Sequence, residues 1–266
     1  MQYDRVFTFG CSYTQFFWPT WADIIETDMG LPTQHWGLCG LGNVGIAHRL
    51  LEADAIHKFT PNDLIIVLWS TWSRECRFVR GQWQCAGNII QDNNTLYKKQ
   101  FVKDHWSIDN DLVKNVGAIT MSNRSFPITY QATMDRTAEI EDKDVYSDSI
   151  LYNTFKDNIE FIRSFDIFQW DNFDRAFDDT MTHVDNHPDI KAHLEFAEEY
   201  IYSKLNRMMK QSTKTYYMQM HNKVVEMGKS GILKKEIRQW SDIEIFFKNH
   251  FDFDGHGKRQ GVPFNK

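Results

Sequence analysis

Leu64-Ile65-Ile66-Val67-Leu68-Trp69 is the stretch that decides the fold class of this chain. These six consecutive apolar residues follow the chain-breaking segment Thr60-Pro61-Asn62-Asp63. An uninterrupted apolar run of this length is typical of a strand that is buried on both faces. Such strands belong to parallel sheets with helices packed against them. The run therefore predicts an inner strand of a parallel α/β sheet.

Upstream of this run, strand and helix patterns alternate. Thr20 can cap a first helix, Gly30 and Pro32 can end it, and Asn43 can cap a second helix. Alternating strands and helices predict a doubly wound parallel sheet. The predicted elements are a strand at 5–9, a helix at 20–26, a strand at 34–38 and a helix with residues 46, 47, 50 and 51 on one face.

Downstream, the pattern is less regular. Residues 76–148 are polar and predict an insertion of loops with a small hairpin. Pro188 suits the first position of a later helix. We divide the chain into an α/β domain, 1–205, and a helical C-terminal extension, 206–266. The remaining predicted elements are a helix over 151–162, a strand at 165–170, a helix over 188–205, amphipathic helices at 216–227 and 232–247, and a polar tail from 255.

The composition excludes several classes of protein. The 266 residues carry a net charge of −6, so a global basic field for nucleic acid is absent. No apolar run reaches the length of a membrane span, and the start of the sequence does not resemble a secretory signal. We therefore expect a cytoplasmic protein with no nucleic-acid partner and no membrane partner. The four cysteines lack a CxxC pair and predict reduced thiols: Cys11, Cys39, Cys76 and Cys85.

Ser12 is the first candidate functional residue. It lies in Val6-Phe7-Thr8-Phe9-Gly10-Cys11-Ser12-Tyr13-Thr14, where an apolar strand runs into a polar turn. A residue in this position stands at the carboxyl end of its strand, the edge where open α/β sheets bind ligands. Helix N–H groups after the turn could face a developing oxyanion. The alternative is that Ser12 is only a helix cap.

Asp185-Asn186-His187-Pro188 supplies two further groups. A serine, a histidine and a carboxylate are the groups that nucleophilic acyl transfer uses. Pro188 would fix the imidazole at a helix start, and Asp185 is close enough in sequence to orient it. The alternative is an Asp-rich surface loop with an incidental histidine.

Gly40-Leu41-Gly42-Asn43 is the third chemistry-bearing segment. Its two glycines allow a close approach of the backbone, and a peptide N–H there could donate to an oxyanion. The alternative is a plain tight turn before a helix.

These three segments together resemble the SGNH/GDSL hydrolase family. The resemblance covers residues 3–75 and 150–204. It implies a flavodoxin-like, three-layer α/β/α fold and esterase, lipase or carbohydrate deacetylase activity without a metal or other cofactor. It also implies that Ser12 is the nucleophile, His187 the base and Asp185 the orienting acid. The N–H groups of Ser12 and Gly40 would be oxyanion donors, together with an asparagine after the third strand.

The chain departs from the family pattern at two places. Gly-Asp-Ser-Leu is replaced by Gly-Cys-Ser-Tyr at 10–13, and the segment after the third strand holds no asparagine. Ser70, Thr71 or Arg74 could supply a donor there, and Asn43 is a further substrate-binding candidate. Because losing one donor costs ~10²–10³ in rate, the enzyme could be slow or inactive. The Trp-Ser-x-x-Ser-Arg segment at 69–74 resembles SGNH-type proteins of tailed phages, which adds a virion-associated location to the expectation.

Three functions remain open on the sequence. The first is a serine esterase acting on a small acyl ester, for which we consider the O-acetyl groups of a glycan. The second is a catalytically weak or inactive protein of the same fold in a virion-like assembly. Residues 206–266 would then contact another copy or an assembly partner. The third is a metal-dependent hydrolase with His183, Asp185 and His187 as ligands.

Overall fold

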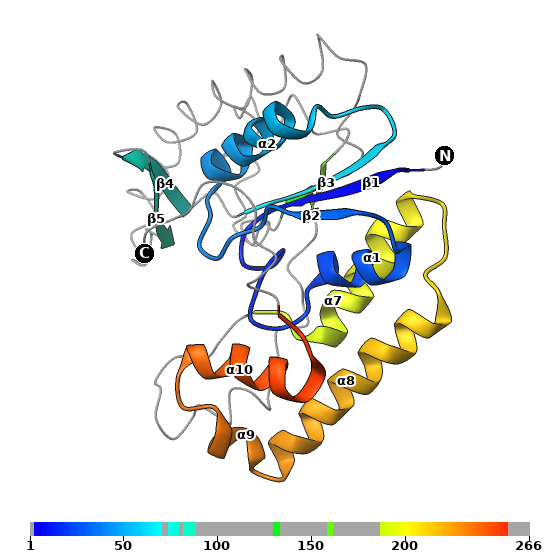
Figure 1. Cartoon of the computed structure of the whole chain (residues 1–266), viewed down its shortest axis with the longest axis vertical. Coiled ribbons are helices and arrows are strands. Elements are labelled where there is room, and N and C mark those ends of the chain that lie inside the picture. The colour runs from blue at the N-terminus through cyan, green and yellow to red at the C-terminus, as the bar shows by residue number, and fades with distance from the viewer. Residues whose placement is uncertain are drawn as a thin grey trace. The chain divides into compact units, whose positions relative to one another are not determined.

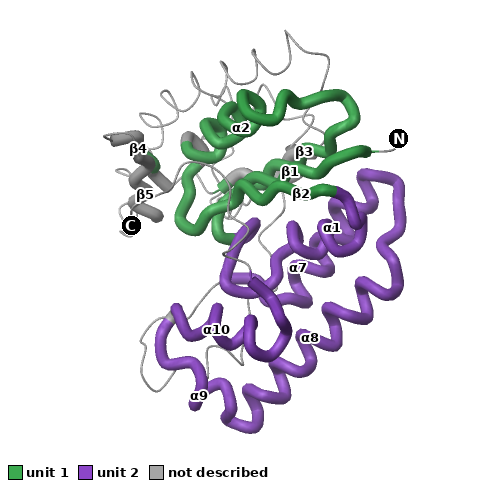
Figure 2. The backbone as a smooth tube through the Cα atoms, in the orientation of Figure 1, with its two compact units in different colours: residues 1–12, 32–164, 260–266 green, residues 13–31, 165–259 purple. Residues whose placement is uncertain are grey.

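The computed structural model describes residues 3–70, 74–79, 82–88, 130–133, 159–161 and 187–254. The chain forms two compact units (Figure 2). The sheet unit comprises residues 1–12, 32–164 and 260–266, and the helical unit comprises residues 13–31 and 165–259. The predicted division of the chain at residue 205 stays a prediction.

The sheet unit is built on a five-stranded sheet in the order β2-β1-β3-β6-β7 (Figure 1). All neighbouring pairs are parallel. This confirms the prediction of a parallel α/β fold, while the doubly wound, three-layer arrangement stays a prediction. The strands are β1 (Arg5–Phe9), β2 (Thr33–His35), β3 (Asp63–Trp69), β6 (Tyr130–Thr133) and β7 (Ile159–Phe161).

β1 and β3 supply the core of the sheet unit. Residues 64–68 of β3 are at most 1% exposed, which confirms the prediction of an inner strand. Helix α2 (Asn43–His57) packs on β1, where the Phe7 ring centroid lies 5.3 Å from that of His57. The apolar face predicted for this helix is confirmed by the burial of residues 46, 47 and 50. The helix cap is Gly42, so the prediction that Asn43 caps the helix is wrong by one residue.

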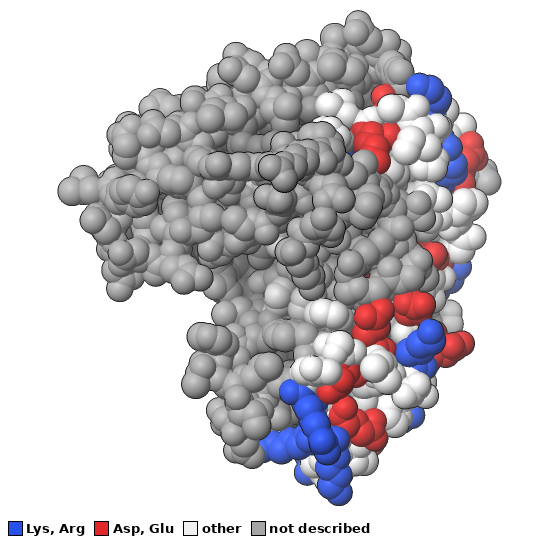
Figure 3. All heavy atoms as spheres, turned by 60° about the vertical axis from the view of Figure 1, so that its left-hand side comes forward, with Lys and Arg blue, Asp and Glu red and all other residues white. Residues whose placement is uncertain are grey.

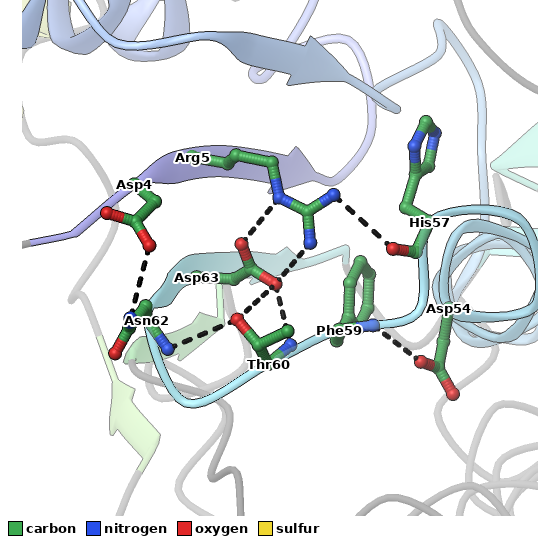
Figure 4. Close-up of polar contacts among 8 residues, drawn as sticks. All are labelled: Asp4, Arg5, Asp54, His57, Phe59, Thr60, Asn62 and Asp63. Atoms are coloured by element: carbon green, nitrogen blue, oxygen red, sulfur yellow. Dashed lines mark hydrogen bonds and ion pairs between the residues drawn. The ribbon is translucent and has the colours of Figure 1, made fainter.

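Arg5 and Asp63 join the amino ends of β1 and β3 (Figure 4). The Nε and Nη2 atoms of Arg5 each donate to a different carboxylate oxygen of Asp63, both at 2.7 Å. The Thr60 N–H donates to the same carboxylate at 2.7 Å. Burial alone would raise the pKa of Asp63, but the hydrogen bonds from Arg5 and Thr60 outweigh it and lower the pKa below its ordinary value.

Arg5→Met should lower the free energy of unfolding by about 2–3 kcal/mol at pH 7, because the buried carboxylate loses its charged partner. The pKa of Asp63 is depressed in the folded state. The contribution of the pair is therefore present above the unfolded pKa of about 3.9 and is lost as pH falls through the folded value. Urea unfolding at pH 7 and below pH 3 measures both conditions.

The matched control for this experiment is Asp4→Asn, which changes an exposed carboxylate bonded to Asn62 at 3.1 Å. Its effect should stay within about 0.5 kcal/mol. A destabilisation by Arg5→Met that is as large below pH 3 as at pH 7 would contradict the assignment.

Residues 76–148 contain more regular structure than the sequence predicts. β4 (Arg74–Val79) and β5 (Gln82–Asn88) form an antiparallel pair, which confirms the expected hairpin. β6 belongs to the main sheet, and no sequence signal had identified it. The prediction of a helix over 151–162 is wrong for Ile159–Phe161, which form the strand β7. A short apolar run with β-branched and aromatic residues suits a strand as well as a helix. The predicted strand at 165–170 and the tail from 255 lie outside the described residues.

Cys76 is disulfide-bonded, so the prediction of reduced thiols is wrong for this residue. The hairpin register places the backbone of Cys85 directly opposite Cys76. Residues that face each other on antiparallel strands are close enough for a disulfide. The search for a CxxC pair could not find such a cross-strand pair. Cys11 and Cys39 are free thiols, as predicted.

The helical unit brings α1 together with the C-terminal helices. The Thr20 cap and the Gly30 end of α1 are confirmed, and the segment predicted at 216–227 lies within α8. The segment predicted at 232–247 forms two helices, because Ile237 has an extended backbone conformation. The elements are α1 (Trp21–Met29), α7 (Ile190–Phe196), the π-helix η2 (Ala197–Tyr202), α8 (Gln211–Lys229), α9 (Ile232–Glu236) and α10 (Trp240–Phe251).

Buried hydroxyls connect α1 to these helices. Tyr202 Oη donates to Asp28 Oδ2 at 2.5 Å, and Tyr217 Oη donates to the Asp23 carbonyl oxygen at 3.1 Å. Burial raises the pKa of both tyrosines, so they remain neutral donors at physiological pH. Residues 202–229 therefore pack as part of the unit that contains α1. In the described part of the chain, no helix combines the length and apolarity that crossing a membrane requires.

Candidate functional site

Three candidate residues follow three adjacent strands of the sheet unit. Ser12 comes after β1, Gly40 after β2, and Ser70 directly after β3. Because these strands are neighbours and parallel, their carboxyl ends meet at one edge, where α/β sheets bind ligands. The N–H of Leu38 donates to the Gly10 carbonyl oxygen at 3.1 Å and joins the first two turns. Ser12 and Ser70 are each 2% exposed.

The turn before α2 has a defined hydrogen-bond pattern. Gly40 has φ +80°, a conformation that favours glycine. The N–H of Leu41 donates to the Leu38 carbonyl oxygen at 3.2 Å, and the N–H of Gly42 donates to Cys76 Sγ at 2.9 Å. Two N–H groups of this turn are therefore engaged within the sheet unit, and the role of Gly40 as an oxyanion donor stays a prediction.

Several predicted site residues cannot be placed as side chains. Thr71, His183 and Asp185 lie outside the described residues. For Asn43 and Arg74 the structure describes the backbone alone, at the starts of α2 and β4. The carboxylate of the triad, the metal-ligand set and the donor after β3 therefore stay predictions.

His187 lies among aromatic rings of the helical unit. Its ring stacks on Phe16 with 4.0 Å between centroids and 16° between planes. The ring of Tyr13 stands at a steep angle to it at 5.2 Å, and the ring of Trp18 at 6.4 Å. We call Tyr13, Phe16 and Trp18 the aromatic holder. Sequence reasoning missed it, although the density of aromatic residues just after Ser12 was a visible signal.

The chain beyond His187 enters α7. Asp189 caps this helix by accepting the N–H of Ala192 at 2.7 Å. Pro188 therefore precedes the cap, and its predicted place at the first helical position is wrong. Its carbonyl oxygen accepts the indole N–H of Trp18 at 2.9 Å. Proline fixes the backbone beside His187, and this hydrogen bond ties that backbone to the holder.

Two further histidines of the helical unit lie in buried surroundings. His193 is 1% exposed, and burial, with a smaller effect of nearby His187, lowers its pKa to about 3. Nδ1 of His221 lies 3.7 Å from Asp189 Oδ2. Burial raises the pKa of Asp189 and lowers that of His221, so the buried surroundings favour the neutral forms of both groups.

His193→Gln should flatten the dependence of stability on pH. The pKa of His193 is lowered in the folded state, so only the unfolded chain binds a proton between about pH 6.5 and the folded value of about 3. The wild-type free energy of unfolding should therefore fall with decreasing pH in this window, by up to about 1.4 kcal/mol per pH unit from this group. Urea unfolding at pH 7, 6, 5 and 4 gives the slope.

His250→Gln is the matched control, because it removes a partly exposed histidine of α10 that is bonded to Glu236 at 2.7 Å. It should leave most of the wild-type slope in place. If His193→Gln and wild type show the same slope, His193 is not held neutral by burial.

Charged side chains of both signs share the surface in the view of Figure 3. Lys and Arg gather at one end of this face, and Asp and Glu lie directly beside them. On the described part of this face, acidic side chains thus lie next to the basic group. The expectation that nucleic acid is not a partner stays a prediction.

Comparisons with known proteins leave the family open. No protein-family model matches the chain, and no curated protein matches it. Among solved structures, the chain is similar to a member of the lipolytic protein G-D-S-L family from Veillonella parvula DSM 2008, with a TM-score of 0.39 and 13% sequence identity. The match covers 76% of this chain and 96% of that chain. A likeness this low does not establish the family, so membership stays a prediction.

Proposed function

We propose that the protein is a serine ester hydrolase that acts on a small acyl ester, with the O-acetyl groups of glycans as the substrate class to test first. Ser12 is the proposed nucleophile, His187 the general base and Asp185 the group that orients the imidazole. The proposal needs no metal and no organic cofactor.

One observation carries the proposal. Ser12 follows β1, at the sheet edge where ligands bind, and its covalent neighbour Tyr13 contacts the ring of His187. The residue that follows Ser12 in the chain thus contacts a histidine from a distant part of the sequence. Gly40 follows the neighbouring strand β2, where its N–H can serve as an oxyanion donor.

The proposed reaction has two halves. His187 takes the proton of Ser12 Oγ while this oxygen bonds to the ester carbonyl carbon. Donors at Ser12 N and Gly40 N stabilise the oxyanion that forms. The intermediate then expels the alcohol, which receives the proton from His187, and an acyl-serine remains. Water, activated by His187 in the same way, releases the acid and restores Ser12.

A fluorophosphonate probe should label the wild-type protein and spare Ser12→Ala, because only an activated serine attacks phosphorus at a useful rate. His187→Gln should label at least ~10²-fold more slowly, since its base is removed. Intact-protein mass spectrometry measures the labelling. The control is Ser230→Ala, which removes a serine at the end of α8 that donates to the Met227 carbonyl oxygen. Equal labelling of wild type and Ser12→Ala would remove the proposal.

Treatment with EDTA should leave the hydrolysis of p-nitrophenyl acetate unchanged, because the proposed mechanism uses only side chains and peptide N–H groups. Activity that is lost with the chelator and regained with Zn²⁺ would instead favour the metal hydrolase with His183, Asp185 and His187.

The non-catalytic role in an assembly would be favoured by a complete absence of turnover. Light scattering of the full chain and of a chain lacking residues 206–266 would then test that role.

A further inference from the structure

The imidazole of His187 is held on one face and on two sides. Phe16 covers the face nearly in parallel, with 16° between the planes. Tyr13 and Trp18 stand at 66° and 87° to the imidazole plane. Trp18 also packs at 82° against Phe16, with 4.4 Å between the ring centroids. A rotation of the imidazole about its bond to Cβ would drive it into these rings, so the holder restricts the ring plane.

The holder is itself fixed within the helical unit. Its exposed fractions are 6% for Tyr13, 4% for Phe16 and 0% for Trp18. The indole of Trp18 is bonded to the Pro188 carbonyl oxygen, and the hydroxyl of Thr20 donates to the Thr14 carbonyl oxygen at 2.8 Å. Rings that are this buried do not offer a surface to a substrate. Their contact with His187 therefore points to a positioning role.

We infer that Phe16 is a positioning residue for the reaction proposed above, because it fixes the plane of the His187 imidazole and stabilises the charge that this ring gains from the Ser12 proton. The inference rests on the proposed function. Phe16 touches neither the substrate nor the reacting atoms in this account, and it acts through His187.

Positive charge develops on the His187 imidazole during the proposed reaction. The face of an aromatic ring attracts a cation whose centre lies within about 6 Å of the ring centroid, and the Phe16 and His187 centroids are 4.0 Å apart. His187 is neutral before the proton transfer and positive after it. An interaction that strengthens only in the transition state raises kcat and leaves KM unchanged. Loss of the Phe16 ring should therefore be a defect in kcat.

Phe16→Leu is the test, since it keeps an apolar side chain and removes the ring. We expect kcat for p-nitrophenyl acetate to fall about three- to tenfold with KM within about twofold of wild type. Phe16→Tyr, which keeps the ring, should restore most of the rate. Phe17→Leu is the matched control, because Phe17 is the next residue and its ring stands edge-on to Phe16 at 4.9 Å.

An NMR signal tests the geometry independently of activity. The ring C–H resonances of His187, assigned by their loss in His187→Gln, should show a ring-current shift in wild type that disappears in Phe16→Leu. If Phe16→Leu does not fold, Trp18→Phe keeps an aromatic ring but removes the N–H donor to the Pro188 carbonyl oxygen and part of the buried ring, and should lower kcat about two- to fivefold.

The possible results distinguish failure of the positioning role of Phe16 from failure of the esterase proposal. A Phe16→Leu rate equal to wild type, with Ser12-dependent labelling intact, overturns the positioning role and leaves the esterase proposal standing. An equal loss of kcat in Phe17→Leu also overturns it, because the effect would then be general loosening. A wild-type protein that the fluorophosphonate does not label overturns the esterase proposal and the positioning role together.

Discussion

The parallel pairing of β1 between β2 and β3 is the constraint on which the candidate site depends. Parallel neighbours end at the same edge, so the turns that carry Ser12, Gly40 and Ser70 all start there. The opposite ends of β1 and β3 are joined by Arg5 and Asp63, which are also register partners. A slip of one residue would separate Arg5 from the buried carboxylate of Asp63 and turn the core side chains to the wrong face. The ion pair at one end thus fixes the register that aligns the turns at the other.

The chain that follows Ser12 carries the rings that surround His187. Residue 13 begins the helical unit, and the first residues of that unit are the aromatic holder. The holder then leads through the Thr20 cap into α1, whose residues Asp23 and Asp28 accept hydrogen bonds from Tyr217 and Tyr202. The segment from Tyr13 to α1 is therefore held by other residues of the helical unit. Tyr202 of η2 and Tyr217 of α8 thus help to hold α1 in place.

The sequence predicted what depends on local pattern and missed what depends on pairing. The apolar run at 64–69 and the strand at 5–9 had signals strong enough to place β3 and β1, and the Thr20 and Gly30 caps bound α1 correctly. β6 and β7 are short, and only their neighbours in the sheet make them strands. The Cys76 disulfide follows from cross-strand register, which no spacing rule contains. Ser12 and His187 could be proposed from residue type. The contact of the aromatic holder with His187 could be seen only in the folded structure.

The position of His187 before α7 creates an electrostatic conflict that its neighbours can resolve. Helix N-termini carry partial positive charge and disfavour a nearby cation by about 0.3–1 kcal/mol. An aromatic face favours a cation by about 0.5–1 kcal/mol, so the Phe16 stack is of the right size to cancel this penalty. His193 lies one turn into the same helix, and its full burial disfavours the charged form of the imidazole.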